Sequence, residues 1–442
     1  MKRINMTLIG AGLAVALALA GCSGAPSTPT TSGAPTPENL TFLTHWGPDQ
    51  VKMLQDAGAA YTQAHPEITV TIQAVPFANL LSTLRTQGTS ADGPTIVGIY
   101  DAWLPELVRD GLAAKVPSDI ASEVTANWPA GVVSAATKQG DLYGIPNEID
   151  LYSLNYNQAL FDQAGITEPP ATWADMTTDA QKISALGNGI QGIGFITNWD
   201  SGVVHPFLSL LASNGGTFLN ADGSAAALDS QQALETAQLY QTLVDSKATD
   251  MSMSPANAST TGPYLDNFAA GKTGMIIMAN WWQSSLQDAM GADFSNVKTA
   301  PIPVGPSGTQ SSSISYSWMT MVNASASADR QAAAWAFLDW LNGPDSGTNG
   351  TSAMGQILLS MGILPTRNSD VAANQATLGT PFLKTYVDEM ANATPFPTVI
   401  GGPAAADALQ KQIESLLAGQ VDASTAMSGA VKDVNSALSA AQ

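Results

Sequence analysis

Strand-like and helix-like segments alternate along most of this chain. Near its start, an alternating run over Ile68–Val75, a helical run over Phe77–Gln87 and an apolar run over Thr95–Tyr100 follow one another. The same order resumes after Asp150 and closes with a helix over Asp329–Leu341. Such alternation predicts an α/β fold, with mostly parallel sheets flanked by helices on both faces. The other expected strands are Leu40–Trp46, Leu151–Tyr156, Ile193–Thr197, Thr273–Met278, Val297–Ile302 and Tyr316–Val322, and the other expected helices are Val51–His65, Trp173–Leu186, Ser230–Lys247 and Trp281–Met290.

Length and composition limit the classes of protein. A chain of 442 residues with 45% hydrophobic residues exceeds one ordinary domain, so two lobes are expected. A net charge of -20 opposes binding to a phosphate backbone, and no nucleic-acid partner is expected. One cysteine and three widely separated histidines exclude a disulfide framework and disfavour a metal site, so we expect no metal or other cofactor.

The N-terminus has the features of an export signal. Lys2 and Arg3 precede an apolar stretch over Ile4–Ala20, which ends in Leu-Ala-Gly before Cys22. This ending resembles the bacterial lipobox, in which the thiol of the cysteine takes the lipid. We therefore expect residues 1–21 to be a lipoprotein signal peptide and Cys22 to be lipidated; the alternatives are a plain signal peptide or a short membrane anchor.

A spacer follows Cys22. Residues 22–37 continue in Ser, Thr, Pro, Gly and Ala, with no charge and no large apolar side chain, which is typical of an extended linker. No later run reaches the roughly 18 apolar residues of a membrane span. The expected location is the extracytoplasmic face of the bacterial cell membrane, with the lipid as the only anchor.

Two glycine motifs resemble nucleotide sites. Gly187–Gly192 fits G-x-G-x-x-G, but a helix precedes it and a strand follows, which reverses the order that a dinucleotide site needs. Gly271–Thr273 resembles the end of a P-loop, but Asp266 stands at the position of the required glycine. Both are expected to be turns.

A third motif partly matches a calcium loop. Asn220, Asp222, Gly223 and Asp229 fit, yet Phe218 occupies the first ligand position. A turn is expected, and calcium binding stays open.

No catalytic motif is complete. The chain has no G-x-S-x-G elbow, and its only cysteine is expected to carry the lipid. Paired carboxylates for glycoside hydrolysis need only be close in space, so a glycan-acting surface enzyme stays an alternative.

A longer segment identifies a family. Asn267–Trp281, which reads NFAAGKTGMIIMANW, resembles the F-x-x-G-K-x-A-M-x-x-x-G-x-W segment of the carbohydrate-binding solute-binding proteins of ABC importers, the group that includes maltose-binding protein. Gly274 and Ala279 are mild departures from it. Three weaker matches follow the family's order: Asp101–Leu112, Tyr143–Asn157 and Gly362–Arg367.

The resemblance implies a clamshell of two lobes joined by a hinge, the periplasmic-binding-protein-like fold. By analogy, lobe one holds residues 38–151 and 303–345, and lobe two holds residues 152–302 and 346–442. The chain would cross the hinge near Asp150–Ser153 and Ile302–Gly305, and again near residues 343–350.

Candidate ligand-binding residues follow from sugar chemistry and from strand ends. Open α/β sheets bind ligands beyond the carboxyl ends of their strands, and sugars need aromatic platforms beside carboxylates and amides. Trp281 matches the platform tryptophan of the family, and either it or Trp282 faces the ligand while the other packs inward. Tyr316 and Trp318 share one strand face, so both line the cleft or both belong to the core. The further candidates are Trp46, Asp49, Asp101, Trp103, Glu148, Asp150, Asn280 and Arg367, and the alternative for Trp103 is core packing and for Arg367 a turn cap.

The expected function is capture without chemistry. A monomer would bind a carbohydrate, most simply an oligosaccharide, close around it, and deliver it to the transmembrane subunits of an ABC permease. The alternatives are another solute such as glycerol phosphate, a polyol, a peptide or a polyamine, or a role in signalling.

Overall fold

The computed structural model of the protein describes residues 38–255 and 262–442. The expected signal peptide, Cys22 and the linker over residues 22–37 lie outside the described residues. Twelve strands are assigned in the described part: β1 (Glu38–Thr44), β2 (Ile68–Ala74), β3 (Ile96–Tyr100), β4 (Thr137–Lys138), β5 (Asp141–Leu142), β6 (Ile145–Asn157), β7 (Gln191–Gly194), β8 (Thr273–Ala279), β9 (Val297–Ala300), β10 (Ile314–Val322), β11 (Leu364–Pro365) and β12 (Thr394–Pro395).

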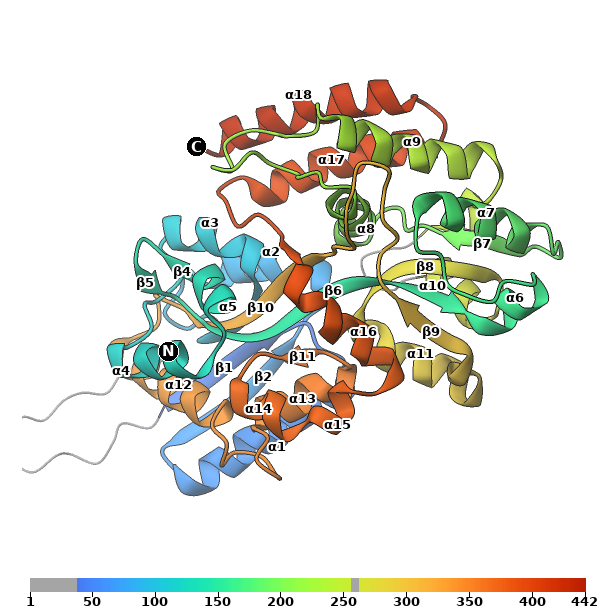
Figure 1. The fold of residues 1–442 in the computed structure, drawn as a ribbon. Coiled ribbons are helices and arrows are strands. Elements are labelled where there is room, and N and C mark those ends of the chain that lie inside the picture. The colour runs from blue at the N-terminus through green and yellow to red at the C-terminus, as the bar shows by residue number, and fades with distance from the viewer. Residues whose placement is uncertain (1–37, 256–261) are drawn as a thin grey trace, which may run out of the picture. The chain divides into compact units, whose positions relative to one another are not determined.

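Helices separate most of these strands (Figure 1). They are α1 (Pro48–Ala64), α2 (Phe77–Gln87), α3 (Leu104–Arg109), α4 (Ser118–Asn127), α5 (Ala130–Ala135), α6 (Gln158–Gln163), α7 (Trp173–Ser184), α8 (Asp200–Ser213), α9 (Gln231–Asp245), α10 (Gly262–Ala269), α11 (Gln283–Met290), α12 (Ala328–Leu341), α13 (Ala353–Met361), α14 (Asn368–Ala373), α15 (Gln375–Leu378), α16 (Pro381–Glu389), α17 (Gly402–Leu417) and α18 (Ala423–Ala441). Short 3-10 turns over Asp101–Trp103 (η1) and Asn280–Trp282 (η3) follow β3 and β8 directly.

One long strand, β6, joins two halves of the main sheet, whose order is β2-β1-β3-β10-β6-β8-β7. Its residues 145–151 pair with β10, and from Tyr152 onward it pairs with β8 and β9. We call β2, β1, β3, β10 and residues 145–151 the first half-sheet, and residues 152–157 with β8, β7 and β9 the second half-sheet. Parallel pairing holds among β1, β2 and β3, between β7 and β8 and between β10 and β12, whereas β10 runs antiparallel to β3 and β6 runs antiparallel to β8, β9 and β10, so the sheet is mixed.

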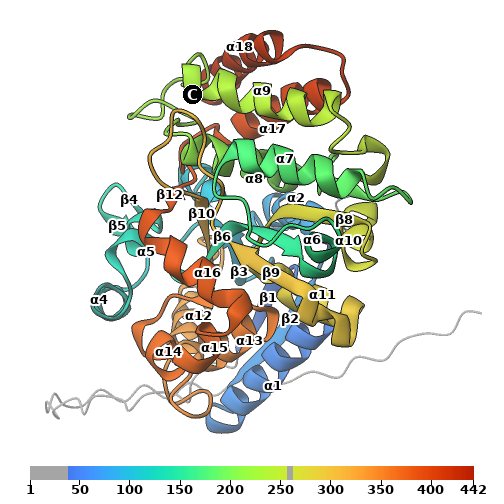
Figure 2. The same cartoon turned by 45° about the vertical axis from the view of Figure 1, so that its right-hand side comes forward.

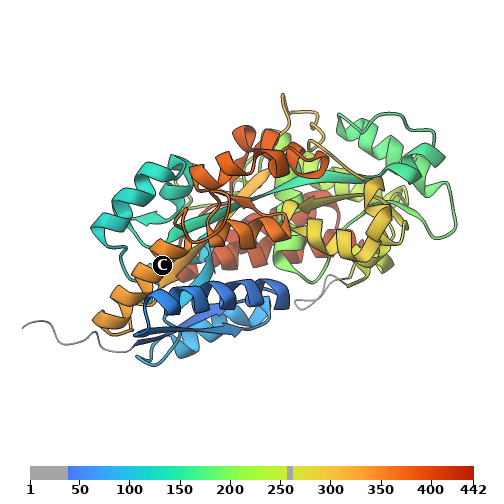
Figure 3. The same cartoon turned by 90° about the horizontal axis from the view of Figure 1, so that it is seen from below.

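Each half-sheet has its own helices. In the first half, α1 lies along the strands, as seen from below in Figure 3, and its Tyr61 packs against Phe337 and Trp340 of α12 at centroid distances of 5.2 Å. In the second half, α7 packs on β7, while α17 and α18 pair with each other and cover α8 and α9 (Figure 2). Both halves therefore bury apolar side chains on helix and sheet, as a two-lobed α/β fold requires.

Most of the elements expected from the sequence are present. The helix over Phe77–Gln87 is α2, and the helix expected from Trp281 begins as the 3-10 turn η3 before α11. Several helices were not predicted, and the longest of them are α8, α17 and α18; α8 contains Pro206, which breaks the usual helical signal. No helix in the described part of the chain is long and apolar enough to span a membrane.

The glycine motif and the calcium-like motif form turns. Gly187 and Gly189, with φ of 74° and 70°, turn the chain from α7 into β7, so the prediction of a turn is confirmed. In the calcium-like segment, the carboxylate of Asp222 accepts hydrogen bonds from the backbone N–H and the hydroxyl of Ser224. Among residues 38–255 and 262–442, no group of three acidic, histidine or cysteine side chains could hold a metal ion.

Candidate functional site

Aromatic and acidic side chains share one face of the sheet where the two half-sheets meet. In the strand register, Trp318 lies opposite Tyr100 on one side and Glu148 on the other, and Tyr316 lies opposite Asp150. Directly opposed residues point to the same face of a sheet, so the register alone brings these five side chains together. Tyr316 and Trp318 thus lie on the same face as the two acids.

Three carboxyl groups are buried at this junction. Asp101, in η1 at the end of β3, is 3% exposed, Glu148 is 3% exposed and Asp150 is 1% exposed. Burial raises the pKa of the Asp101 carboxyl to about 7. Burial, and then the neighbouring Asp150, raise the pKa of Glu148 well above its usual value, and burial also raises the pKa of Asp150. Glu148 and Asp150 each shift the pKa of the other, so the two carboxyl groups titrate together and not as independent groups.

The hydrogen bonds around these acids are incomplete. Oδ2 of Asp101 accepts from the backbone N–H of Ser317 at 2.9 Å, whereas Oδ1 makes no hydrogen bond of ordinary geometry among the described residues, although the adjacent backbone N–H of Ala102 also favours the charged form of this carboxyl. Oδ1 of Asp150 accepts from the amide of Asn280 at 2.9 Å. The ammonium group of Lys138, which donates to the Thr398 hydroxyl at 3.0 Å, acts electrostatically on Asp101.

Asn280 holds the junction together. Its Oδ1 accepts from the backbone N–H of Leu151 at 3.0 Å, and its amide nitrogen also donates to the carbonyl of Gly362 at 3.1 Å. The side chain is fully buried. Its polar atoms are therefore engaged in protein contacts, one of which positions the carboxyl of Asp150.

Three tryptophans gather on the second half-sheet. Trp281 and Trp282 pack with ring centroids 4.2 Å apart, and Trp199 meets them edge-on at 5.9 and 6.2 Å. Trp282 is 6% exposed and packs inward, whereas Trp281 is partly exposed. The indole N–H of Trp281 donates to the hydroxyl of Tyr316 at 2.7 Å and so links this group to the acidic face.

A second aromatic group lies on the first half-sheet. The rings of His45 and Trp318 are 4.4 Å apart, and Trp103 packs against Trp318 at 5.6 Å and against Phe77 at 6.1 Å. Trp103 is 8% exposed and belongs to this packed group, while Trp318 is partly exposed. Burial lowers the pKa of His45 to about 4, so its ring is neutral at pH 7.

Three of the candidate residues make their contacts away from the buried acids: Trp46, Asp49 and Arg367. Trp46 is partly buried with its ring 6.4 Å from that of Phe42, and Asp49 is exposed in the first turn of α1. The guanidinium of Arg367 donates to Glu123 at 3.2 Å and to Ser369 at 2.9 Å, and it lies over Trp128. Because these partners engage Arg367, we leave it out of the proposed site.

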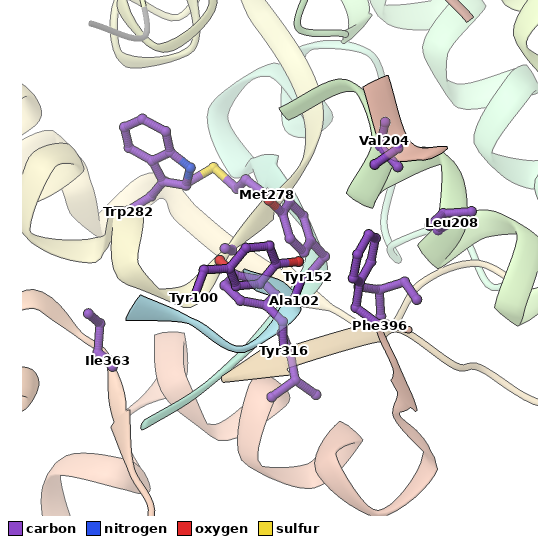
Figure 4. Packing of buried hydrophobic residues seen from close by; sticks show 14 of the residues in the cluster. Tyr100, Ala102, Tyr152, Val204, Leu208, Met278, Trp282, Tyr316, Ile363 and Phe396 are labelled. Carbon is purple, nitrogen blue, oxygen red and sulfur yellow. The ribbon is translucent and has the colours of Figure 1, made fainter. Parts of the chain in front are cut away.

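Sequence reasoning missed several members of the junction. His205 of α8 lies between the hydroxyls of Tyr100, at 3.2 Å, and Tyr152, at 3.3 Å, and burial lowers its pKa to about 3. Figure 4 shows Tyr100, Tyr152, Tyr316 and Phe396 close to one another, and the His205 ring packs against those of Tyr316 and Phe396 at 4.9 and 5.0 Å. Trp199 follows the strand predicted at Ile193–Thr197, so the strand-end rule could have found it; His205 lies on a helix that carried no recognised signal.

A cavity of about 310 Å³ lies beside the junction. It is lined by α8, by the loop over residues 216–223 and by residues 394–399, and most of its lining is apolar. Phe396 packs against His205 at 5.0 Å and against Phe218 at 6.2 Å. The Phe396 side chain thus connects the junction to the lining of this cavity.

Comparison with known proteins identifies the family. The profile of the bacterial extracellular solute-binding proteins matches residues 47–348, which is well over half of the chain. The chain belongs to this family. The family is described as extracellular, and a relative from Deinococcus radiodurans, 25% identical over 53% of this chain and 56% of its own length, is described as an ABC transporter-binding protein. The two-lobed α/β fold agrees with that assignment, because solved structures of the maltose-binding-protein group share it.

Individual relatives are similar to this solute-binding protein over most of its length. A binding protein of Brucella abortus is 30% identical over 293 residues, covering 65% of this chain and 67% of that protein. The arabinooligosaccharide-binding protein of Halalkalibacterium halodurans is 21% identical and covers 61% of each chain. The solved cyclic alpha-maltosyl-1,6-maltose binding protein of Arthrobacter globiformis is 26% identical, with a TM-score of 0.73 over 91% of this chain and 99% of that one.

Proposed function

We propose that this solute-binding protein captures a carbohydrate, most simply an oligosaccharide, and delivers it to an ABC permease without chemical change. One observation carries the proposal: a partly exposed tryptophan platform, Trp281, is hydrogen-bonded to a strand face that carries buried carboxyls. Aromatic rings stack on the C–H faces of sugars, and carboxyl groups bind their hydroxyls. Relatives that bind arabinooligosaccharide and a cyclic maltosyl-maltose support the same solute class.

The proposed site comprises residues from both half-sheets. Trp281 forms the platform, Trp282 supports it from behind, and Asp101, Glu148 and Asp150 supply polar contacts. Tyr316 and Trp318 form the base. Trp46, after β1, and Asp49, in the first turn of α1, border the site, and Trp103 and Asn280 position their neighbours. The acids argue against glycerol phosphate, because buried carboxyls repel a phosphate group.

The mechanism is closure of two lobes around the ligand. We place lobe one at residues 38–151 and 303–345 and lobe two at residues 152–302 and 346–442, except that β11 pairs with residues 148–149 of β6 and α13 packs on α1, so this part of the last segment joins lobe one. The change of β6 partners between Leu151 and Tyr152 supports a hinge there. A ligand that contacts both lobes stabilises the closed form, which the permease then accepts.

We further propose that a lipid anchor holds the protein at the outer face of the cell membrane. Lipid on Cys22 would tether the binding body to the outer face of the membrane and raise its effective concentration at the permease. Membrane fractions of cells expressing the full chain should hold the protein, and Cys22→Ala should release it. A Cys22→Ala protein that stays in the membrane fraction would contradict the lipid anchor.

A calorimetric panel of neutral oligosaccharides tests capture directly. We expect saturable one-to-one binding by at least one sugar, and Trp281→Ala should weaken it about 100-fold, because a stacked aromatic platform is lost. Trp340→Phe, a change on α12 beside Tyr61, is the matched control and should leave affinity unchanged. Flat titrations for every sugar would overturn the proposal, and product analysis after long incubation would reveal a glycan-acting enzyme instead.

A further inference from the structure

The buried acids lack positive charge. Glu148 and Asp150 come from β6 and Asp101 comes from η1, so separate elements bring three carboxyls to one junction. Lys138 is the only cation in the described part of the chain that acts electrostatically on them, and it acts on Asp101. The neighbouring His205 is neutral, and the hydroxyl groups of Tyr152 and Tyr316 carry no positive charge. Among the described residues, three buried carboxyl groups thus have one ammonium group near them, and it acts on Asp101 alone.

One carboxylate oxygen is also without a hydrogen bond. Oδ1 of Asp101 is buried and makes no hydrogen bond of ordinary geometry among the described residues, although Oδ2 of the same group is bonded to Ser317. Buried polar atoms are nearly always hydrogen-bonded, because the loss of water otherwise costs free energy. An unpartnered oxygen beside a carboxyl pair indicates that a donor from outside the chain completes the group.

A sugar can offer the buried carboxyls two kinds of hydrogen-bond donor, a hydroxyl group or a protonated amine. A hydroxyl satisfies the oxygen but brings no charge, so the acids stay partly protonated. A protonated amine donates up to three hydrogen bonds and supplies the missing charge, and its bonds to carboxylates are about twice as strong as neutral ones. The ring that carries the amine can still stack on Trp281, which a linear polyamine cannot do.

We propose that the ligand is a sugar with a free amine, whose ammonium group is held by Asp101 and the Glu148–Asp150 pair. This inference rests on the proposed function and narrows it to one class of carbohydrate. An ammonium group favours the ionised form of the carboxyls beside it, so its binding lowers their raised pKa values and capture releases a proton to solvent. A neutral sugar at the same site leaves that proton in place.

Matched sugars separate this inference from the proposed function. The probes are D-glucosamine with D-glucose and N-acetyl-D-glucosamine, and the β-1,4-linked disaccharides of the same three sugars. We expect the amine to bind at least about 10-fold more tightly than its hydroxyl and acetamide counterparts. If hydroxyl or acetamide sugars bind as tightly as the amine, this inference fails and sugar capture stands. If none of these sugars binds but another oligosaccharide does, this inference fails and sugar capture stands, and if no sugar of either panel binds, both proposals fail.

Proton release provides a second readout on the unaltered protein. Calorimetry at about pH 6, where a sugar amine keeps its proton, is repeated in buffers of different ionisation enthalpy. We expect release of about one proton with the amine and none with the hydroxyl sugar. Equal proton exchange with both sugars would overturn the inference.

A variant of Asp101 tests whether the buried acids cause the preference for the amine sugar. Asp101→Asn should reduce the preference for amine over hydroxyl by about 10-fold, because one negative charge is removed. Asp288→Asn, an exposed position on α11, makes the same change in net charge and should leave the preference intact. A preference that survives Asp101→Asn in full, in protein with an unaltered melting temperature, would contradict the assignment.

Discussion

Asp101 and Asp370 are equally buried, at 3% and 2% exposure, yet their surroundings differ. Both oxygens of Asp370 are hydrogen-bonded to Ser352, at 2.8 Å to its backbone N–H and 2.6 Å to its hydroxyl, and Arg367 supplies a nearby positive charge. Asp101 has one unpartnered oxygen and lies near Asp150, a second acid. A buried acid with complete contacts stabilises the fold, whereas one with incomplete contacts is suited to bind a ligand.

The largest expected effect is on stability at the satisfied acid. Asp370→Ala leaves the Ser352 N–H and hydroxyl without their acceptor, and it should lower the free energy of unfolding by about 3 kcal/mol. Chemical denaturation measures this change. Asp101→Asn is the control and should cost little stability, because the asparagine oxygen can still accept from Ser317. Equal losses in both variants would remove the distinction between the two acids.

The next effect is on affinity. Asp101→Asn should weaken binding of the best sugar by about 30-fold, because a charged hydrogen bond to the ligand is lost, and calorimetry measures it. Asp288→Asn should bind as the unaltered protein does. The account of Asp101 fails if its variant binds with unchanged affinity.

The pH dependence of stability provides a third test. An acid whose folded pKa is raised binds more protons in the native state than in the unfolded state, so stability falls as pH rises between the two values. For Asp101 this window runs from its unfolded pKa of about 3.9 to its folded pKa of about 7. Melting temperature should therefore fall from pH 4 to pH 7, and Asp101→Asn should flatten this slope by up to about 1.4 kcal/mol per pH unit. An unchanged slope in the variant would show that Asp101 does not titrate as a buried acid.

The smallest expected effect is a loss of stability on substitution of Arg367. Arg367→Met removes the ion pair with Glu123 and the contact with the Trp128 ring, and it should cost about 1 kcal/mol of stability with no change in affinity. Denaturation and calorimetry on the same sample measure both quantities. A marked loss of sugar affinity in this variant would contradict the prediction and show that Arg367 belongs to the binding site.

The sequence predicted the alternating architecture, the strand that becomes β8 and the tryptophan pair after it, because apolar periodicity and the motif around Trp281 are local signals. It could not decide which tryptophan is exposed, since that depends on packing against Trp199 across the chain. Arg367 looked available in the sequence, and its partner Glu123 lies 244 positions away. The unpartnered oxygen of Asp101 likewise depends on the register of β3, β10 and β6, which no local pattern encodes.

A crystal structure of the protein with the tightest-binding sugar tests the central claim most directly. The account predicts a sugar ring stacked on Trp281, with a donor from the sugar within hydrogen-bond distance of Oδ1 of Asp101. A sugar bound in the cavity lined by α8 and residues 394–399, with Oδ1 of Asp101 still unpartnered, would contradict it.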